Sequence, residues 1–193
     1  MSLLHFDGFD GLAVADLAPL GGYIPTGTLT MVAGRFPSFN SQAVQTGGAA
    51  NTTDGLTVVH AAKAIVTYGL AVRFGGSAAT YRVLSGRNGA TEAFNLVRNT
   101  AGRLVIRSGT SATDVAVGTQ VLTTGQWYYL EVQFNYPGSG NPTVTVRVNG
   151  GVDITNSSTF GSAVQLDRVV LGFSFSTVQV APSFSIDDLY ILD

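Results

Sequence analysis

The glutamate and histidine side chains that could carry hydrolytic chemistry are few in this 193-residue chain. Glu92 and Glu131 are its two glutamates, and neither has a second carboxylate two residues away. A glycosidase needs two carboxyl groups flanking the bond that it cleaves, so no such pair is indicated. His5 and His60 each lie in a short apolar run, which favours a hydrogen-bonded packing role over acid–base catalysis. We therefore expect no catalytic residue and no enzymatic activity.

Two pairs of aspartates, one near each end of the sequence, form a second candidate site. Asp7 and Asp10 flank glycines in FDGFDG, and Asp187 and Asp188 are adjacent in the last apolar segment. Carboxylate oxygens are the ligands that Ca²⁺ prefers. However, adjacent residues on a regular strand point to opposite faces. Calcium thus stays a candidate for these four aspartates, but we favour no metal and no cofactor, with one aspartate accepting backbone hydrogen bonds from the Asp-Gly turn and a β-bulge in the last strand.

The composition argues against several kinds of partner. Charged residues make up 11% of the chain and hydrophobic residues 45%, and the formal net charge is −2. Nucleic acid is held mainly by Lys and Arg, and this chain has one lysine, Lys63, so we expect no nucleic acid. It lacks an apolar run of about 18 residues and a signal segment, so we expect no membrane and synthesis in the host cytoplasm. Its neutral surface would lose little hydration under another protein, which favours a packed assembly and a homo-oligomer.

Alternation with a period of two residues predicts strands along the chain, with fewer than about one residue in ten in helix. The clearest segments are 68–74, 127–134, 143–148 and 169–175, and shorter candidates lie at 3–6, 28–33, 56–60, 80–84, 92–97, 103–107 and 114–117. Asn149, Gly150 and Gly151 form a hairpin turn that joins the third of the clear segments to a short strand at 152–154. No shift in composition or fixed repeat separates a second unit, so we expect a single domain over residues 1–193. The residues expected in the core of the clear segments are Tyr68, Leu70, Val72, Phe74, Tyr128, Leu130, Val132, Phe134, Val144, Val146, Val148, Val169, Leu171, Phe173 and Phe175.

Four segments stand out along the chain: LLHFDGFDG at the start, TTGQWYYLEVQF, PTVTVRVNGGVD, and IDDLYILD at the end. In this order they resemble the concanavalin A-like, laminin-G-like jelly-roll superfamily, and in particular its versions in bacteriophage virion proteins. The resemblance implies an all-β, two-sheet antiparallel jelly-roll sandwich whose first and last strands are neighbours, which would bring the four aspartates close together. Many glucanases of the superfamily carry a Glu-x-Asp-x-x-Glu strand, which this chain lacks.

The resemblance also implies a function in binding. We expect a non-enzymatic phage virion protein, a capsid decoration or cement protein that binds coat subunits; the alternative is a carbohydrate-binding receptor module of a phage tail or spike. Phe36, Phe39 and Tyr136, in Pro/Gly/Asn-rich stretches, are the candidate interaction surface, unless they plug the ends of the core. Trp127 could stack on a sugar, but we favour a role in covering the edge of the core.

Overall fold

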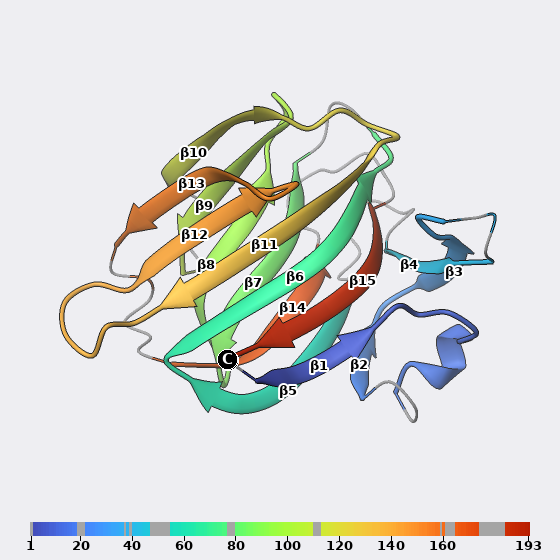
Figure 1. Cartoon of the computed structure of the whole chain (residues 1–193), viewed down its shortest axis with the longest axis horizontal. Coiled ribbons are helices and arrows are strands. Elements are labelled where there is room, and N and C mark those ends of the chain that lie inside the picture. The colour runs from blue at the N-terminus through green and yellow to red at the C-terminus, as the bar shows by residue number, and fades with distance from the viewer. Residues whose placement is uncertain are drawn as a thin grey trace.

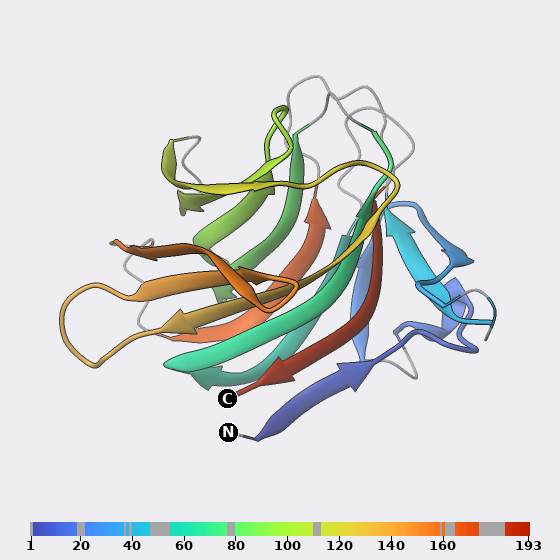
Figure 2. The same cartoon turned by 45° about the horizontal axis from the view of Figure 1, so that its top comes forward.

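The computed structural model describes residues 2–18, 22–36, 38, 40–46, 55–76, 80–109, 113–158, 160, 165–173 and 184–193. These residues form two antiparallel β-sheets that face each other (Figures 1 and 2). They are 67% strand and 3% helix, so the predicted all-β, two-sheet antiparallel sandwich is confirmed. None of the helical residues described belongs to a helix long and apolar enough to cross a membrane.

Sheet A holds eight strands and sheet B seven, counted over the described residues. The spatial order in sheet A is β13 (Gly151–Ser157), β12 (Thr143–Val148), β11 (Trp127–Asn135), β6 (Ile65–Phe74), β15 (Phe184–Leu192), β4 (Gln42–Thr46) and β3 (Leu29–Ala33), and β1 (Leu3–Asp7) pairs with β15 beside β4. The order in sheet B is β10 (Asp114–Val121), β9 (Arg103–Ser108), β8 (Thr91–Arg98), β7 (Tyr81–Asn88), β14 (Leu166–Phe173), β5 (Gly55–Lys63) and β2 (Tyr23–Thr26). A short 3-10 turn, η1 (Val14–Asp16), follows β1.

The core lies between the two sheets and uses alternate residues of each strand. On β11 and β12, the predicted inward residues are all buried, which confirms the register of both strands. Phe94 of sheet B stacks on Phe134 of sheet A, with the ring planes 2° apart. Val169 and Leu171 are buried on β14 as predicted, whereas Phe175 lies outside the described residues.

The first and last strands are neighbours, as the resemblance implied. β1 pairs antiparallel with β15, and Figure 2 shows the two ends of the chain side by side. The backbone N–H of Ser2 donates to Asp193 Oδ1 at 2.6 Å, and Lys63 forms an ion pair with the same carboxylate.

The opposite side of the sandwich is closed by a side chain. Asp153 on β13 accepts hydrogen bonds from the backbone N–H groups of Thr119 and Gln120 on β10, both at 2.9 Å. Gly118 makes this approach possible, because a Cβ atom there would overlap the Asp153 carboxylate. One carboxylate thus joins the edges of the two sheets.

Candidate functional site

A row of side chains, all but one of them polar, crosses the face of sheet B that points away from the core. From β5 to β10 the row consists of Thr57, Val170, Ser85, Asn95, Arg107 and Asp114. Their neighbours along the strands, such as Leu84 and Leu96, belong to the core. Ser85 and Asn95 in the middle of the row are nevertheless completely buried. This outer face therefore has a polar floor beneath longer side chains.

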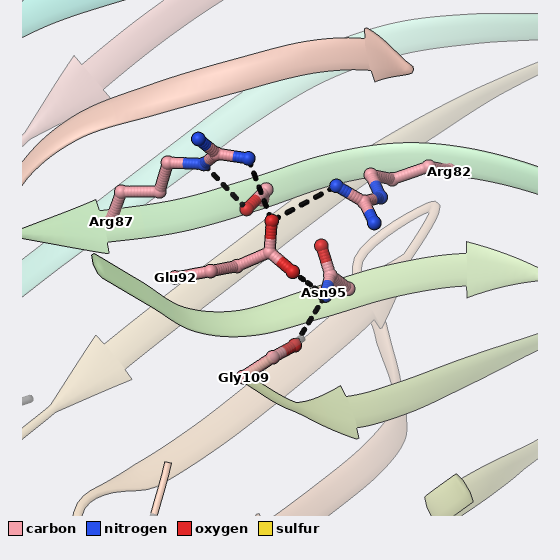
Figure 3. Close-up of polar contacts among 6 residues, drawn as sticks. Arg82, Arg87, Glu92, Asn95 and Gly109 are labelled. Carbon is pink, nitrogen blue, oxygen red and sulfur yellow. Dashed lines mark hydrogen bonds and ion pairs between the residues drawn. The ribbon is translucent and has the colours of Figure 1, made fainter. Parts of the chain in front are cut away.

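Glu92 links the strands on this face through an ion-pair network (Figure 3). Its Oε2 accepts hydrogen bonds from Arg82 Nη1 at 2.9 Å and from Arg87 Nη2 at 2.7 Å. Glu92 and Asn95 are three residues apart and would lie on opposite faces of a regular strand. A bulge opposite Gly86 and Arg87 brings both side chains to the outer face.

The side-chain amide nitrogen of Asn95 is hydrogen-bonded, whereas its oxygen has no partner among the described residues. Its Nδ2 donates to Glu92 Oε1 and to the backbone oxygen of Gly109, the latter at 2.6 Å (Figure 3). These two acceptors fix which end of the amide is the nitrogen. Asn95 Oδ1 is buried and accepts no hydrogen bond from any residue that the structure describes. A buried acceptor without a donor costs free energy, so this oxygen favours a ligand or water that can donate to it.

Arginines dominate the charge of this face. Burial lowers the pKa of Arg82; the Glu92 carboxylate opposes this shift, while Arg87 and Arg107 add to it. Arg107 pairs with Asp114 at 2.7 Å. The face therefore combines rigidly held hydrogen-bond donors and acceptors, which can bind groups that both donate and accept.

This cluster was missed by the sequence analysis, which considered Glu92 only as one half of a catalytic pair. A signal for it was present: the turn at Gly89 and Ala90 sets Arg87 directly opposite Glu92 in the β7–β8 hairpin. Opposite charges at facing positions indicate a cross-strand pair. The positions of Arg82 and Asn95 depend on the bulges, which the pattern does not reveal.

The aspartates that were candidates for calcium accept hydrogen bonds from the chain. Asp187 Oδ2 accepts from the backbone N–H of Arg35 at 2.9 Å, and its Oδ1 accepts from the N–H of Asp188 at 2.9 Å. Asp188 pairs with the Arg35 guanidinium at 3.1 Å. Burial raises the pKa of Asp187, and the charge of Asp188 adds to this effect. The predicted bulge is present, because the pairing of β15 with β6 shifts between Asp187 and Tyr190.

The two N-terminal aspartates lie close to the bulge in β15, since Asp7 pairs with Leu189. Asp7 Oδ1 accepts from the N–H of Phe9 within the Asp-Gly turn at 2.7 Å, and Asp10 Oδ1 accepts from the N–H of Gln42 at 2.8 Å. The turn is thus bonded by Asp7, whereas Asp187 accepts from Arg35, in the chain after β3, and from its own neighbour Asp188. Within the described ranges, no group of three or more acidic or histidine residues could hold a metal ion.

The predicted aromatic surface is divided. Phe36 is 48% exposed, and the Arg35 guanidinium lies over its ring at 4.5 Å. Tyr136 directly follows β11. Its side chain is half-buried and packs against the core, in line with the alternative that it plugs the end of the core. Phe39 lies outside the described residues. Phe36 and Tyr136 therefore do not form one surface.

Trp127 does not cover the core edge, and that prediction is wrong. Its ring lies on the outer face of sheet A, half-buried, with the Arg73 guanidinium 5.0 Å from the ring centre. Farther along that face, the hydroxyl of Tyr190 donates to Glu131 Oε1 at 2.7 Å, and the ring of Tyr190 lies across Gly69. Burial and these polar contacts raise the pKa of Tyr190. Side chains of sheet A thus contact one another over this part of its outer face.

Both histidines are held by buried tyrosines, which confirms the predicted packing role. His5 Nε2 lies 2.9 Å from the hydroxyl of Tyr23, and His60 Nε2 lies 3.1 Å from that of Tyr68. Burial lowers the pKa of both histidines.

No family model and no curated protein sequence matches the chain. A sialidase structure matches 99% of this chain with a TM-score of 0.76 and 9% identity, and the match covers 18% of the sialidase. The binding domain of Paraclostridial Mosquitocidal Protein 1 matches 98% with a TM-score of 0.67 and 12% identity, over 48% of that chain. An alginate lyase in complex with alginate trisaccharide matches 98% with a TM-score of 0.64 and 10% identity, over 97% of that chain. The chain spans less than two thirds of the first two structures, and the likeness shows the fold alone.

Proposed function

We propose that this chain is a non-catalytic binding module, acting as one domain, that holds a glycan on the outer face of sheet B. The observation that carries the proposal is the buried polar floor of that face, in which Asn95 Oδ1 has no donor among the described residues and Asn95 Nδ2 bonds Glu92, the ion-pair partner of Arg87. Sugar hydroxyls both donate and accept hydrogen bonds, so they can match such an array. The floor stands on paired strands, which hold binding groups more rigidly than loops do.

The comparisons are compatible with this function. A protein with this fold was solved in complex with alginate trisaccharide, and another is described as a binding domain. Since fold alone does not determine function, the weight rests on the side chains of sheet B.

The absence of catalysis is also part of the proposal. The Glu92 carboxylate already accepts three hydrogen bonds, from Arg82, Arg87 and Asn95, and so is poorly placed to take a proton from a substrate. His60 is engaged with Tyr68, whose side chain belongs to the core. A carboxylate held in this way suits the orientation of arginines better than proton transfer.

A glycan array followed by calorimetry tests the proposal. We expect the protein to retain at least one glycan, and Arg87→Gln to weaken that binding about tenfold or more, because a hydrogen bond from a charged donor is worth about 1.5–3 kcal/mol. The matched control is Arg147→Gln, on the outer face of sheet A, which should bind as the unaltered protein does. Failure to retain any glycan, or equal losses in the two variants, contradicts the proposal.

The second candidate is the predicted capsid decoration protein, located in the virion and binding coat subunits. It is favoured by two large apolar side chains that β1 exposes, Leu3 at 61% and Phe6 at 67% exposure, because protein contacts bury such side chains. Co-sedimentation with assembled shells tests it. We expect shell binding that Phe6→Ser reduces if this candidate is right, and glycan binding unchanged by Phe6→Ser if the first is.

A further inference from the structure

The proposed glycan site carries an excess of positive charge, and on the strength of that proposed function we infer its ligand class: a sugar bearing a carboxylate, which binds Arg87 beside Glu92. Arg82 and Arg87 share the single carboxylate of Glu92, whose side chain is 3% exposed. The neighbouring Arg107 has an acidic partner of its own, Asp114. Among the described residues, Glu92 thus faces two guanidinium groups with one carboxylate, so this cluster carries a net positive charge that a ligand can balance.

Arg87 is the arginine that a ligand can reach. Its side chain is 24% exposed, against 11% for that of Arg82. Arg87 Nε donates to Ser85 Oγ at 3.2 Å and Nη2 donates to Glu92 at 2.7 Å. Nη1 has no partner within the described part of the chain, and Figure 3 shows it turned away from Glu92. A carboxylate placed there gains a charge-assisted hydrogen bond, which is about twice as strong as a neutral one.

The sugar ring itself would extend from Arg87 toward Asn95 and Arg107. These residues lie on the successive strands β7, β8 and β9. Arg107 is in register with Asn95 and Ser85, so Arg87 and Arg107 are two strand spacings apart across the sheet and two residues apart along it, or about 12 Å. That span accommodates about two sugar rings lying across the strands, with hydroxyl groups near Asn95 Oδ1. The carboxylate at one end would set the direction of the chain.

The charge of Glu92 predicts the direction in which the affinity for acidic glycans changes when negative charge is removed. Its negative charge repels a carboxylate on the ligand but has little effect on a neutral sugar. Removing negative charge from this face must therefore strengthen binding of acidic glycans and leave binding of neutral ones nearly unchanged. A neutral ligand class predicts no such difference.

The experiment compares acidic glycans with their neutral counterparts by calorimetry at 50 and 300 mM salt. The probes are sialyllactose with lactose, and a uronate trisaccharide with its carboxyl-reduced form. We expect at least one acidic member to bind tenfold or more tightly than its counterpart, and the difference to shrink in high salt. Arg87→Gln should remove that preference, and the control Arg147→Gln should keep it.

Two variants test whether removing negative charge strengthens the binding of acidic glycans. Asp114→Asn removes an exposed charge from the same row, and we expect it to tighten acidic binding about threefold with little change in melting temperature. Glu92→Gln should tighten it further, provided that its circular dichroism stays that of the unaltered protein. If Asp114→Asn leaves the affinity for acidic glycans unchanged or weakens it, the inference is wrong.

The remaining outcomes separate this inference from the proposed function. Equal binding of acidic and neutral members, still weakened by Arg87→Gln, would overturn the acidic ligand class and leave a glycan-binding module. Absence of binding to every probe and every arrayed glycan would overturn both.

Discussion

Arg98 donates two hydrogen bonds to the backbone oxygen of Leu122, from Nε at 3.1 Å and from Nη2 at 2.7 Å. The arginine is 3% exposed and forms no ion pair with the residues that the structure describes. Its charge is accommodated instead by the ring of Phe74, 5.0 Å away, and by that of Tyr81 at 5.8 Å. Burial lowers the pKa of Arg98. The pair joins the end of β8 to the segment that leads from β10 to β11.

Replacing Arg98 with lysine should therefore destabilise the fold although the charge is kept. An ammonium group cannot donate both hydrogen bonds in this planar arrangement, and we expect a loss of about 2 kcal/mol in the free energy of unfolding. Urea denaturation measures it. Arg103→Lys, at an exposed position of β9, is the control and should change the free energy by less than about 0.5 kcal/mol. Equal effects would mean that the Leu122 contact contributes nothing.

The Asp153 contact between β13 and β10 should control how firmly the sandwich is closed on that side. Asp153→Ala removes the acceptor for two backbone N–H groups, and we expect a loss of about 1–3 kcal/mol in stability. Amide hydrogen exchange should accelerate at Thr119 and Gln120 more than in the centre of the sheets. Asp114→Ala, at the start of the same strand, should leave those two amides protected; acceleration in both variants would show a general loosening of β10.

Acid should destabilise the protein through His5 and His60. Burial lowers the pKa of each in the folded state, so the unfolded chain binds protons first as the pH falls below about 6.5. The stabilising contribution of the two neutral histidines is therefore complete above pH 6.5. It declines as the pH falls from there toward their lowered pKa values in the folded state.

The hydrogen bonds of His60 define its neutral form. Nδ1 lies 2.8 Å from the backbone oxygen of Ala61, which assigns the proton to Nδ1 and leaves Nε2 to accept from Tyr68.

Melting temperatures at pH 7.5 and 5.5 measure this decline. His60→Gln should make it smaller, because one of the two titrating groups is gone. A melting temperature that stays constant between the two pH values would contradict the effect.

Gly69 should tolerate no side chain while Tyr190 covers it. A Cβ atom at Gly69 would overlap the ring of Tyr190, so Gly69→Ala must displace that ring and break its hydrogen bond to Glu131. We expect a loss of about 1–3 kcal/mol. In a Tyr190→Ala background the same change at Gly69 should cost much less, which a double-mutant cycle measures. An equal cost in both backgrounds would show that the ring is not the obstacle.

The fold could be predicted because hydrophobic alternation is a local property. On β11 and β12 every second residue is aromatic or branched, and the neighbours Glu131 and Arg147 are polar, so the register follows from the spacing alone. β2, which contains Pro25, has no such alternation and was not predicted. Its pairing with β5 comes from the tertiary structure.

The candidate site could not be predicted because it depends on departures from regular pairing. Arg82, Arg87 and Glu92 read along the chain as ordinary charges on the solvated side of a hairpin. Irregular pairing of β7 with β8 brings Glu92 to the same face as Asn95 and buries it between two arginines. The prediction for Trp127 was wrong for a different reason. Its alternation with Tyr128 places it on the outer face, but the general preference of tryptophan for buried positions was given more weight than that pattern.

The position of β15 in sheet A has a consequence for how the protein is made. β15 pairs with β6 on one side and with β1 and β4 on the other. During synthesis these three earlier strands therefore lack a pairing partner until β15 has been made. Until residues 184–192 leave the ribosome, β6 has an unpaired edge in the middle of the nascent chain. Such long-range pairing slows folding and exposes apolar strands for longer. Co-translational folding should therefore stop at an incomplete sheet until residues 184–192 have been synthesised, and chaperones should bind the nascent chain most strongly before that point.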